Sequence, residues 1–172
     1  MRIFEFLSQG GVIMYILLVL NVIGIALIIT KFVLFKREGQ SVDLTIEKMK
    51  QTIKNENSTA DMSTMIELSK REISVYMAKL EKGLNTIKII ASISPLLGLL
   101  GTVTGVLMAF RIISQTGATN PADFAGGIAM ALVTTIGGLI VAIPNFVGHN
   151  YLLGGLDRLE VTIEKKLLSK IL

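Results

Sequence analysis

The stretch GIAMALVTTIGGLIVAIP, residues 127–144, decides the fold class of this chain. It holds no charged residue, and an uncharged apolar run of this length is typical of a helix that crosses a membrane. The run also contains the adjacent residues Thr134 and Thr135, and it ends at Pro144. Because a helix that contacts only lipid has no need of two neighbouring hydroxyls, the surface that they face is informative about function.

Two further stretches have the same character. Residues 12–30 and 89–110 are uncharged, and with residues 124–143 they form three segments, each long enough to cross about 30 Å of hydrocarbon. The first run is too long for the apolar part of a signal peptide, and no small-residue cleavage site follows it, so we expect it to be retained. The sequence therefore predicts an all-α integral membrane protein with three transmembrane helices.

The distribution of basic residues predicts the orientation of these helices. Eleven Lys and Arg residues lie between positions 31 and 88 and four lie after position 151, whereas the N-terminal segment contributes only Arg2 and the connector between the second and third spans only Arg111. By the positive-inside rule, the middle segment and the tail are predicted to be cytoplasmic and the N-terminus external. This topology explains the excess of basic residues without a nucleic-acid partner.

These observations divide the chain into seven predicted segments. They are an external N-terminal segment (1–11), the first transmembrane helix (12–35), a cytoplasmic helical segment (36–88), the second transmembrane helix (89–113), an external connector (114–123), the third transmembrane helix (124–153) and a cytoplasmic C-terminal helix (154–172). Within the cytoplasmic segment, a short amphipathic helix is expected before a loop at residues 55–58.

An apolar seam links the cytoplasmic segment to the second span. Positions spaced alternately three and four residues apart carry mainly apolar side chains from Met62 to Ile87, and Gly83 is the one weak point for a helix. We therefore expect a single helix from about residue 63 to about residue 112, so that the second and third helices are long and extend into the cytoplasm. After Gly154 and Gly155, a separate C-terminal helix is expected.

Small side chains form one stripe on the second span and another on the third, and such stripes let membrane helices approach closely. The predicted helix-packing residues are Pro95, Gly98, Gly101, Gly105, Gly138 and Pro144. On the third span, residues from Gly127 to His149 that are small or polar fall within a sector about 100° wide. Thr134 and Thr135 therefore face the same way as the small residues and not lipid.

Little conventional chemistry is available in this sequence. There is no cysteine, no cluster of metal ligands and no pair of carboxylates in the membrane segments, so neither an enzyme nor a cofactor or metal site is expected. The glycines from Gly98 to Gly105 lie inside a membrane helix and do not follow a strand, which argues against a nucleotide site. The threonines also have a structural interpretation, since Thr in a membrane helix often bonds to a carbonyl of its own helix.

The two inner spans resemble the ExbB/TolQ/MotA family of ion-driven motors. The similarity rests on SPLLGLLGTVTGV, residues 94–106, followed by GGIAMALVTTIGGLIVAIP, residues 126–144. One span before the long cytoplasmic segment resembles the ExbB/TolQ branch, because MotA-like members have four spans.

The resemblance implies a homopentamer in the bacterial inner membrane, whose second and third helices form a bundle around a central pore. It also implies a dimer of a single-span partner of the ExbD/TolR type in that pore, with a membrane aspartate at which ion passage drives rotation. By their places in the motifs, Thr102 and Thr135 match threonines of the family, Pro95 and Pro144 match its two prolines, and Asn150 matches a polar residue just beyond the span.

One position departs from the family pattern. Well-known members carry Glu where this chain has Met130, so the partner is expected to supply the titrating carboxylate. The predicted ion pathway consists of Thr102, Thr135 and Thr134, and the predicted pore-flanking residues are Met130, Asn145 and Asn150. Hydroxyls can relay protons through water or coordinate sodium as neutral oxygens. We expect the transported ion to be H⁺, with Na⁺ as the alternative because of the additional Thr134.

The sequence thus predicts a cation-channel subunit of a motor that energises processes of the cell envelope. Its predicted partners are copies of itself, the ExbD/TolR-like protein and membrane lipid. Two alternatives stay open: a non-conducting scaffold that holds a partner helix, and a passive channel without mechanical coupling.

Overall fold

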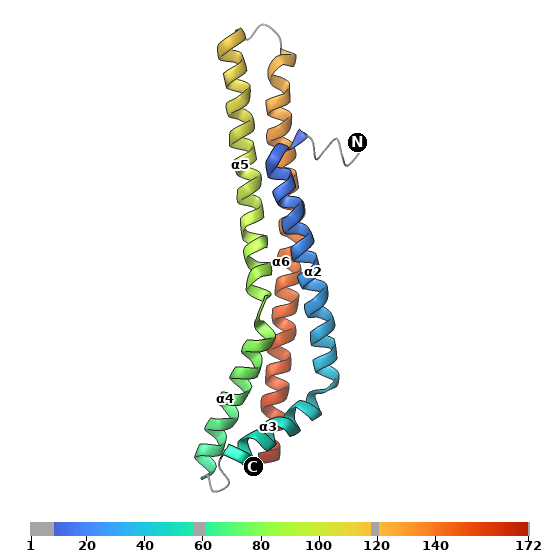
Figure 1. Ribbon diagram of the computed structural model, residues 1–172, viewed down its shortest axis with the longest axis vertical. Coiled ribbons are helices and arrows are strands. Elements are labelled where there is room, and N and C mark those ends of the chain that lie inside the picture. Colours follow the sequence, from blue (N-terminus) through green and yellow to red (C-terminus); the bar gives the residue numbers. More distant parts are fainter. Residues whose placement is uncertain (1–8, 57–60, 118–120, 172) are drawn as a thin grey trace. The chain divides into compact units, whose positions relative to one another are not determined.

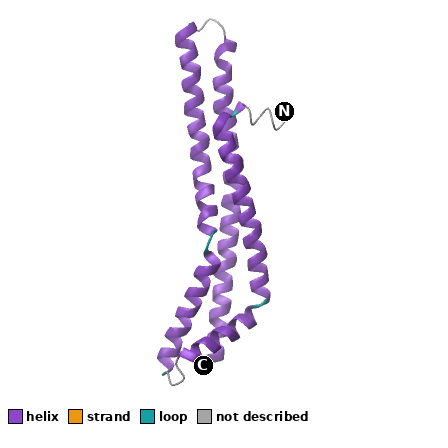
Figure 2. Ribbon diagram, viewed as in Figure 1, coloured by secondary structure: helices purple, strands orange, loops and turns teal. Residues whose placement is uncertain are grey.

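The computed structural model describes residues 9–56, 61–117 and 121–171, and within these ranges it contains helices and no strand (Figure 2). The helices are α2 (Gly11–Gln40), α3 (Val42–Glu56), α4 (Met62–Glu81), α5 (Leu84–Thr116) and α6 (Pro121–Ile171). Three of them contain segments long and apolar enough to cross a membrane, within Gly11–Gln40, Leu84–Gln115 and Phe124–Lys170. The prediction of an all-α multi-pass membrane protein with three spans is confirmed.

The helices, which are labelled in Figure 1, contribute to two compact units. The first unit contains the described part of Met1–Leu27 together with Thr86–His149, which are the beginning of α2, most of α5 and the first part of α6. The second unit contains Ile28–Asn85 and Asn150–Leu172, which are the end of α2, all of α3 and α4, and the last part of α6.

In the first unit, three helices pack around a small apolar core. Helix α5 runs antiparallel to α6, because Gly105 lies against Gly127 and Gly98 lies against Gly138. Helix α2 runs parallel to α6, since the start of α2 lies beside Met130 and its later residue Gly24 lies beside Asn145. The core cluster consists of Met14, Leu17, Ile90, Val133 and Val141.

The second unit is built from amphipathic helices. On α3, the buried residues recur every three or four positions, so one face of this helix is apolar, and α3 packs against α4. Helices α4 and α6 supply matching apolar faces. The buried side chains are Val42, Ile46, Met49 and Ile53 on α3, Ile73, Met77 and Leu80 on α4, and Leu152, Leu156, Leu159, Ile163 and Leu167 on α6.

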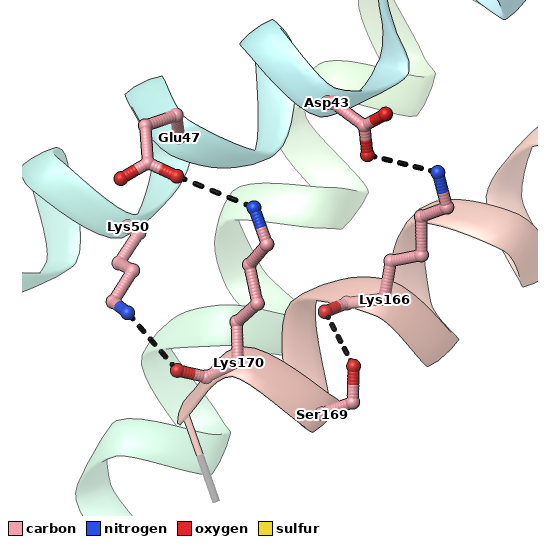
Figure 3. Close-up of polar contacts among 6 residues, drawn as sticks. All are labelled: Asp43, Glu47, Lys50, Lys166, Ser169 and Lys170. Carbon is pink, nitrogen blue, oxygen red and sulfur yellow. Dashed lines mark hydrogen bonds and ion pairs between the residues drawn. The ribbon is translucent and has the colours of Figure 1, made fainter.

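Charged side chains join α3 to the end of α6 (Figure 3). Lys166 Nζ lies 2.8 Å from Asp43 Oδ1, and Lys170 Nζ lies 3.3 Å from Glu47 Oε2. Lys50 Nζ donates a hydrogen bond of 3.1 Å to the carbonyl oxygen of Lys170. The hydrogen bond from Lys166, and then its positive charge, lower the pKa of Asp43. Because these side chains are exposed, the pairs add little stability, and the buried apolar residues carry the packing.

The expected single helix from residue 63 to residue 112 is wrong. Helices α4 and α5 are separate, with Lys82 and Gly83 between them, and Gly83 has a φ of +97°, a left-handed value that glycine adopts readily. Lys31 Nζ donates a hydrogen bond of 3.0 Å to the carbonyl oxygen of Leu80. This carbonyl is among the last four of α4, which a helix end leaves without intrahelical partners. The Lys31 side chain therefore caps α4.

The expected separate C-terminal helix is also wrong, because α6 continues without a break through Gly154 and Gly155. Asn55 and Glu56 belong to α3 and not to a loop, whereas the rest of that predicted loop, residues 57–58, lies outside the described residues. Most of the predicted external N-terminal segment and residues 118–120 of the predicted connector lie outside them as well.

Candidate functional site

Glycines bring α5 and α6 of the same chain into backbone contact. A Cβ atom at Gly105 would lie 2.5 Å from the carbonyl oxygen of Gly127 and 2.8 Å from the backbone nitrogen of Ala131. Reciprocally, a Cβ at Gly127 would lie 2.6 Å from the carbonyl oxygen of Gly105. No side chain fits at such distances, so these glycines set how closely the two membrane helices approach.

The same contact continues toward the start of α5. A Cβ at Gly138 would lie 2.6 Å from the carbonyl oxygen of Ser94, and a Cβ at Gly98 would lie 2.9 Å from that of Thr134. At Gly101, a Cβ would overlap the side chain of Thr134. The small-residue stripes suggest helices of several subunits around a narrow space, and the structure packs the two stripes against each other within one protomer.

Thr102 on α5 and Thr135 on α6 meet across this contact. Their Oγ1 atoms lie 2.5 Å apart, and either can be the donor. Thr102 Oγ1 also lies 3.2 Å from the carbonyl oxygen of Ala131, and Thr135 Oγ1 lies 3.4 Å from that of Gly98. Both side chains are half-buried. We define the hydroxyl cluster as these four oxygens: Thr102 Oγ1, Thr135 Oγ1 and the carbonyl oxygens of Gly98 and Ala131.

Thr134 has a different environment from its neighbour Thr135. It is fully buried, with 0% of its surface exposed, and its Oγ1 donates to the carbonyl oxygens of Met130 and Ala131, each at 3.0 Å. Both acceptors belong to its own helix, and the side chain fills the space above Gly101. Thr134 thus adopts the helix back-bonding that the sequence offered as the structural interpretation of the threonines.

Met130 lies on the side of α6 that meets α2. Its Cε atom is 3.1 Å from the position that a Cβ on Gly11 would take, at the start of α2, and the Met130 side chain is half-buried. Thr135 follows Met130 by five residues, which is about 140° around a helix, so the two side chains leave α6 in different directions. Within the protomer, Met130 therefore contacts α2 and not the hydroxyl cluster.

Asn145 occupies a buried notch between α6 and α2. Its Nδ2 donates to the carbonyl oxygen of Val141 at 2.7 Å, and its amide fills the space that a side chain at Gly24 would need. The side chain is 0% exposed, and its Oδ1 has no hydrogen-bond donor. Sequence reasoning did not pair Asn145 with Gly24, although a lone glycine within an otherwise bulky span was the available signal.

Asn150, which was predicted to flank the pore, and two other polar residues of the spans lie outside the hydroxyl cluster. Asn21 lies on α2, and its Oδ1 is buried without a hydrogen-bond donor. Asn150 is exposed on α6 and His149 beside it is half-buried. Pro95 and Pro144 lie inside α5 and α6, where each removes one backbone hydrogen bond without ending its helix.

The chemistry that this arrangement offers is that of neutral oxygens in an apolar surrounding. No group of three or more His, Asp or Glu side chains that could hold a metal ion occurs in the part of the chain that the structure describes. Between residues 89 and 156, Asp123 is the only acidic residue. The hydroxyl cluster can accept and donate hydrogen bonds, but it holds no group that titrates near neutral pH.

Comparisons with known proteins agree on the kind of protein to which these spans belong. The pattern described as the MotA/TolQ/ExbB proton channel family matches residues 40–165. The biopolymer transport protein ExbB of Aquifex aeolicus (strain VF5) is 46% identical over 74 residues, which are 43% of this chain and 50% of that protein. Biopolymer transport protein exbB1 of Vibrio cholerae is 40% identical over 86 residues, which are 49% of this chain and 38% of that protein. The matched part therefore spans half or less of the length of these curated relatives.

Proposed function

Since this chain belongs to the MotA/TolQ/ExbB proton channel family and is similar to proteins of its ExbB branch, we propose that it is the channel-forming subunit of an ion-driven membrane motor. In this proposal, five copies surround a dimer of a single-span protein of the ExbD/TolR type in a bacterial inner membrane. The N-terminus is external and the C-terminus cytoplasmic, as the distribution of Lys and Arg favours.

The observation that carries the proposal is the hydroxyl cluster. Thr102 and Thr135 come from different helices, yet their hydroxyls are within hydrogen-bonding distance of each other and of two backbone carbonyls. Both side chains stay half-exposed in the protomer, so they are accessible to a partner helix. A polar, partly exposed pair in an apolar helix surface is a place at which an ion can be passed to another group.

The partner supplies the carboxylate that the apolar stretches of the two inner spans lack. With Met130 at the position where the family resemblance implies Glu, residues 89–110 and 124–143 contain no acidic side chain. A proton that binds and leaves the partner's carboxylate changes the charge in the pore, and the hydroxyls stabilise the charged state by hydrogen bonding. Each elementary charge that crosses 100 mV releases about 2.3 kcal/mol, which is enough to bias a change of helix packing.

The geometry favours protons over sodium as the transported ion. The hydroxyls of Thr102 and Thr135 are hydrogen-bonded to each other. Thr134, which was the reason to consider sodium, donates its hydrogen bonds within its own helix. A relay of hydrogen bonds suits proton transfer, whereas a sodium site needs several oxygens directed at one point. Thr134 is accordingly assigned to helix packing, and Thr102 and Thr135 to the proton pathway.

The decisive experiment removes the two hydroxyls. The complex of this subunit with its co-purified single-span partner is reconstituted into liposomes, and proton uptake is followed under an applied potential, in sodium-free and sodium-containing buffers. Thr102→Val and Thr135→Val keep the side-chain shape, and we expect each to slow proton uptake tenfold or more, because losing one such bond costs about 1–3 kcal/mol. Thr104→Val is the matched control, because the Thr104 hydroxyl bonds to carbonyls of its own helix.

The outcomes separate a proton-driven motor from a sodium-driven one and from a non-conducting scaffold. Full proton uptake by the Thr102→Val, Thr135→Val double variant in an intact complex would contradict the pathway. Uptake that requires sodium would indicate a sodium-driven version of the same motor. The scaffold alternative draws support from the internal bonds of both hydroxyls, and it predicts no ion flux from any variant or from the wild type.

A further inference from the structure

An apolar groove lies between the end of α2 and the last part of α6, within the second unit. It has a volume of about 280 Å³ and is lined by Phe32, Phe35, Lys36, Tyr151, Leu152 and Gly155. The rings of Phe32 and Tyr151 are 6.3 Å apart and tilted by 32°, and together they form one wall. Gly155 forms the floor, because a Cβ there would meet only Phe35, at 3.8 Å.

The groove lies where apolar membrane sequence gives way to charged sequence. On α2, Phe35 is followed directly by Lys36 and Arg37, and on α6 Tyr151 lies just beyond the apolar run that ends at Val147. Aromatic side chains are enriched at this depth, where their rings reach the level of lipid headgroups. The two residues of the aromatic wall are exposed, with 48% of Phe32 and 69% of Tyr151 accessible in the protomer.

The charge of the groove identifies its occupant. Lys36 is the one charged residue among those lining it, and no carboxylate is among them. An apolar helix from another protein would desolvate this ammonium group without a counter-charge, whereas a phospholipid offers an acyl chain for the aromatic wall and a phosphate for Lys36. A headgroup without an ammonium group would strengthen the contact, because its net negative charge also attracts Arg37, which follows Lys36 in the chain.

We propose that this groove binds one acyl chain of an anionic phospholipid, with the phosphate beside Lys36. The inference depends on the membrane spans of α2 and α6 and not on ion conduction. It is therefore tested by lipid binding alone, whatever the outcome of the flux experiment.

The experiment measures which lipids stay bound to the intact complex. The purified protein is incubated in detergent with equal amounts of phosphatidylglycerol and phosphatidylethanolamine, and retained lipids are counted by native mass spectrometry. We expect phosphatidylglycerol to be preferred, and Lys36→Gln to reduce this preference about fivefold, the factor that corresponds to about one basic residue near an anionic surface. Gly155→Leu should fill the groove and abolish retention of that lipid.

Gly154→Leu is the matched control, because a Cβ at Gly154 meets no atom within 4 Å. Helix content and melting temperature are checked for each variant, so that loss of lipid is not confused with unfolding. Equal lipid retention by the two leucine variants would overturn the groove as the binding site, and an unchanged lipid preference in Lys36→Gln would overturn the headgroup contact. Loss of the oligomer with unchanged lipid binding in Gly155→Leu would show that another copy of the chain occupies the groove.

Discussion

At the scale of single residues, two adjacent glycines of α6 have opposite structural requirements. A Cβ at Gly127 would lie 2.6 Å from the carbonyl oxygen of Gly105 and 2.9 Å from the backbone nitrogen of Ala109, whereas a Cβ at Gly126 would meet no atom within 4 Å. The sequence around both is nearly the same, so only the face of the helix distinguishes them. Backbone atoms cannot move aside as a flexible side chain can, and this makes Gly127 irreplaceable in the protomer.

Gly127→Leu is therefore expected to separate α5 from α6 and to destabilise the protomer by about 3 kcal/mol or more, the upper end of the usual cost of overpacking. Gly126→Leu should leave the protomer folded. The yield of extracted protein and its melting temperature in detergent are the measurements. Equal losses in both variants would contradict the close contact, and would point to the connector as the sensitive feature.

The surroundings of Met130 favour a negatively charged replacement over a positively charged one. Its methyl group lies beside Gly11 at the start of α2, and the first turn of α2 contains no acidic residue. The beginning of a helix carries a partial positive charge from its free N–H groups, so a carboxylate is favoured there and an ammonium group is not.

We accordingly expect Met130→Glu to be tolerated better than Met130→Lys. Both introduce a charge at membrane depth, at a cost of about 3 kcal/mol, but the start of α2 favours the carboxylate by about 0.3–1 kcal/mol and disfavours the ammonium group. The fraction of each variant that is extracted as an intact complex is the measurement. A Lys variant that assembles as well as the Glu variant would mean that Met130 does not lie beside this helix end.

At the scale of helices, a phenol links α4 to the end of α2. Tyr76 Oη donates a hydrogen bond of 2.5 Å to Glu38 Oε2. Burial, followed by the bond to Glu38, raises the pKa of Tyr76 from 10.0 to about 12. Because the pKa of Tyr76 is higher in the folded state than in the unfolded state, the protonated phenol contributes to the free energy of unfolding. This contribution is fully present below pH 10 and is lost as the pH rises through about 12.

An alkaline titration tests this link. The difference in tyrosinate absorbance between the wild type and Tyr76→Phe isolates the ionisation of this one phenol, which we expect near pH 12. Glu38→Gln should move it to lower pH, because the negative charge of Glu38 opposes formation of a second anion beside it. A difference signal centred at pH 10 in the wild type would show that Tyr76 is neither buried nor bonded to Glu38.

The helices also show how far sequence reasoning reaches. The spans follow from local composition. The helical period places Gly98 and Thr102 on one face of α5 and Thr135 on the small-residue face of α6, and the structure brings these residues together. The break at Gly83 could not be predicted in the same way, because it is capped by Lys31, which is 49 residues from Leu80 in sequence. A glycine inside a helix costs about 1 kcal/mol, and distant contacts decide whether the helix continues past it.

Gly154 and Gly155 show the opposite outcome. They carry a larger local penalty than Gly83, yet α6 continues through them because the flanking residues Leu152 and Leu156 are both buried. The contact between Asn145 and Gly24 could not be predicted from the sequence either, since it depends on the register of α2 against α6.

At the scale of the whole molecule, the protomer leaves much apolar surface for other molecules to cover. Helix α5 alone exposes large side chains along its length, and in a membrane protein these contact lipid or neighbouring helices. The exposed residues include Leu96, Leu99, Leu100, Val103, Leu107 and Phe110. This surface is consistent with the proposed pentamer, in which α5 and α6 pack around a partner.

The orientation of the chain in the membrane determines which side that partner's ion pathway opens to, and it can be tested directly. The chain has no cysteine, so a single introduced cysteine reports one position without background. Ala122, at the start of α6, and Asn55, near the end of α3, both have exposed side chains. The positive-inside rule places the first outside and the second in the cytoplasm, because eleven basic residues lie between positions 31 and 88.

In spheroplasts, a membrane-impermeant maleimide should therefore label Ala122→Cys and should label Asn55→Cys only after the membrane is permeabilised. Labelling of both after permeabilisation serves as the control for accessibility. The opposite pattern would place the Lys-rich helices α3 and α4 outside, where the basic residues near the spans would oppose insertion. It would also reverse, relative to the subunit, the direction in which inward-moving protons pass Thr102 and Thr135.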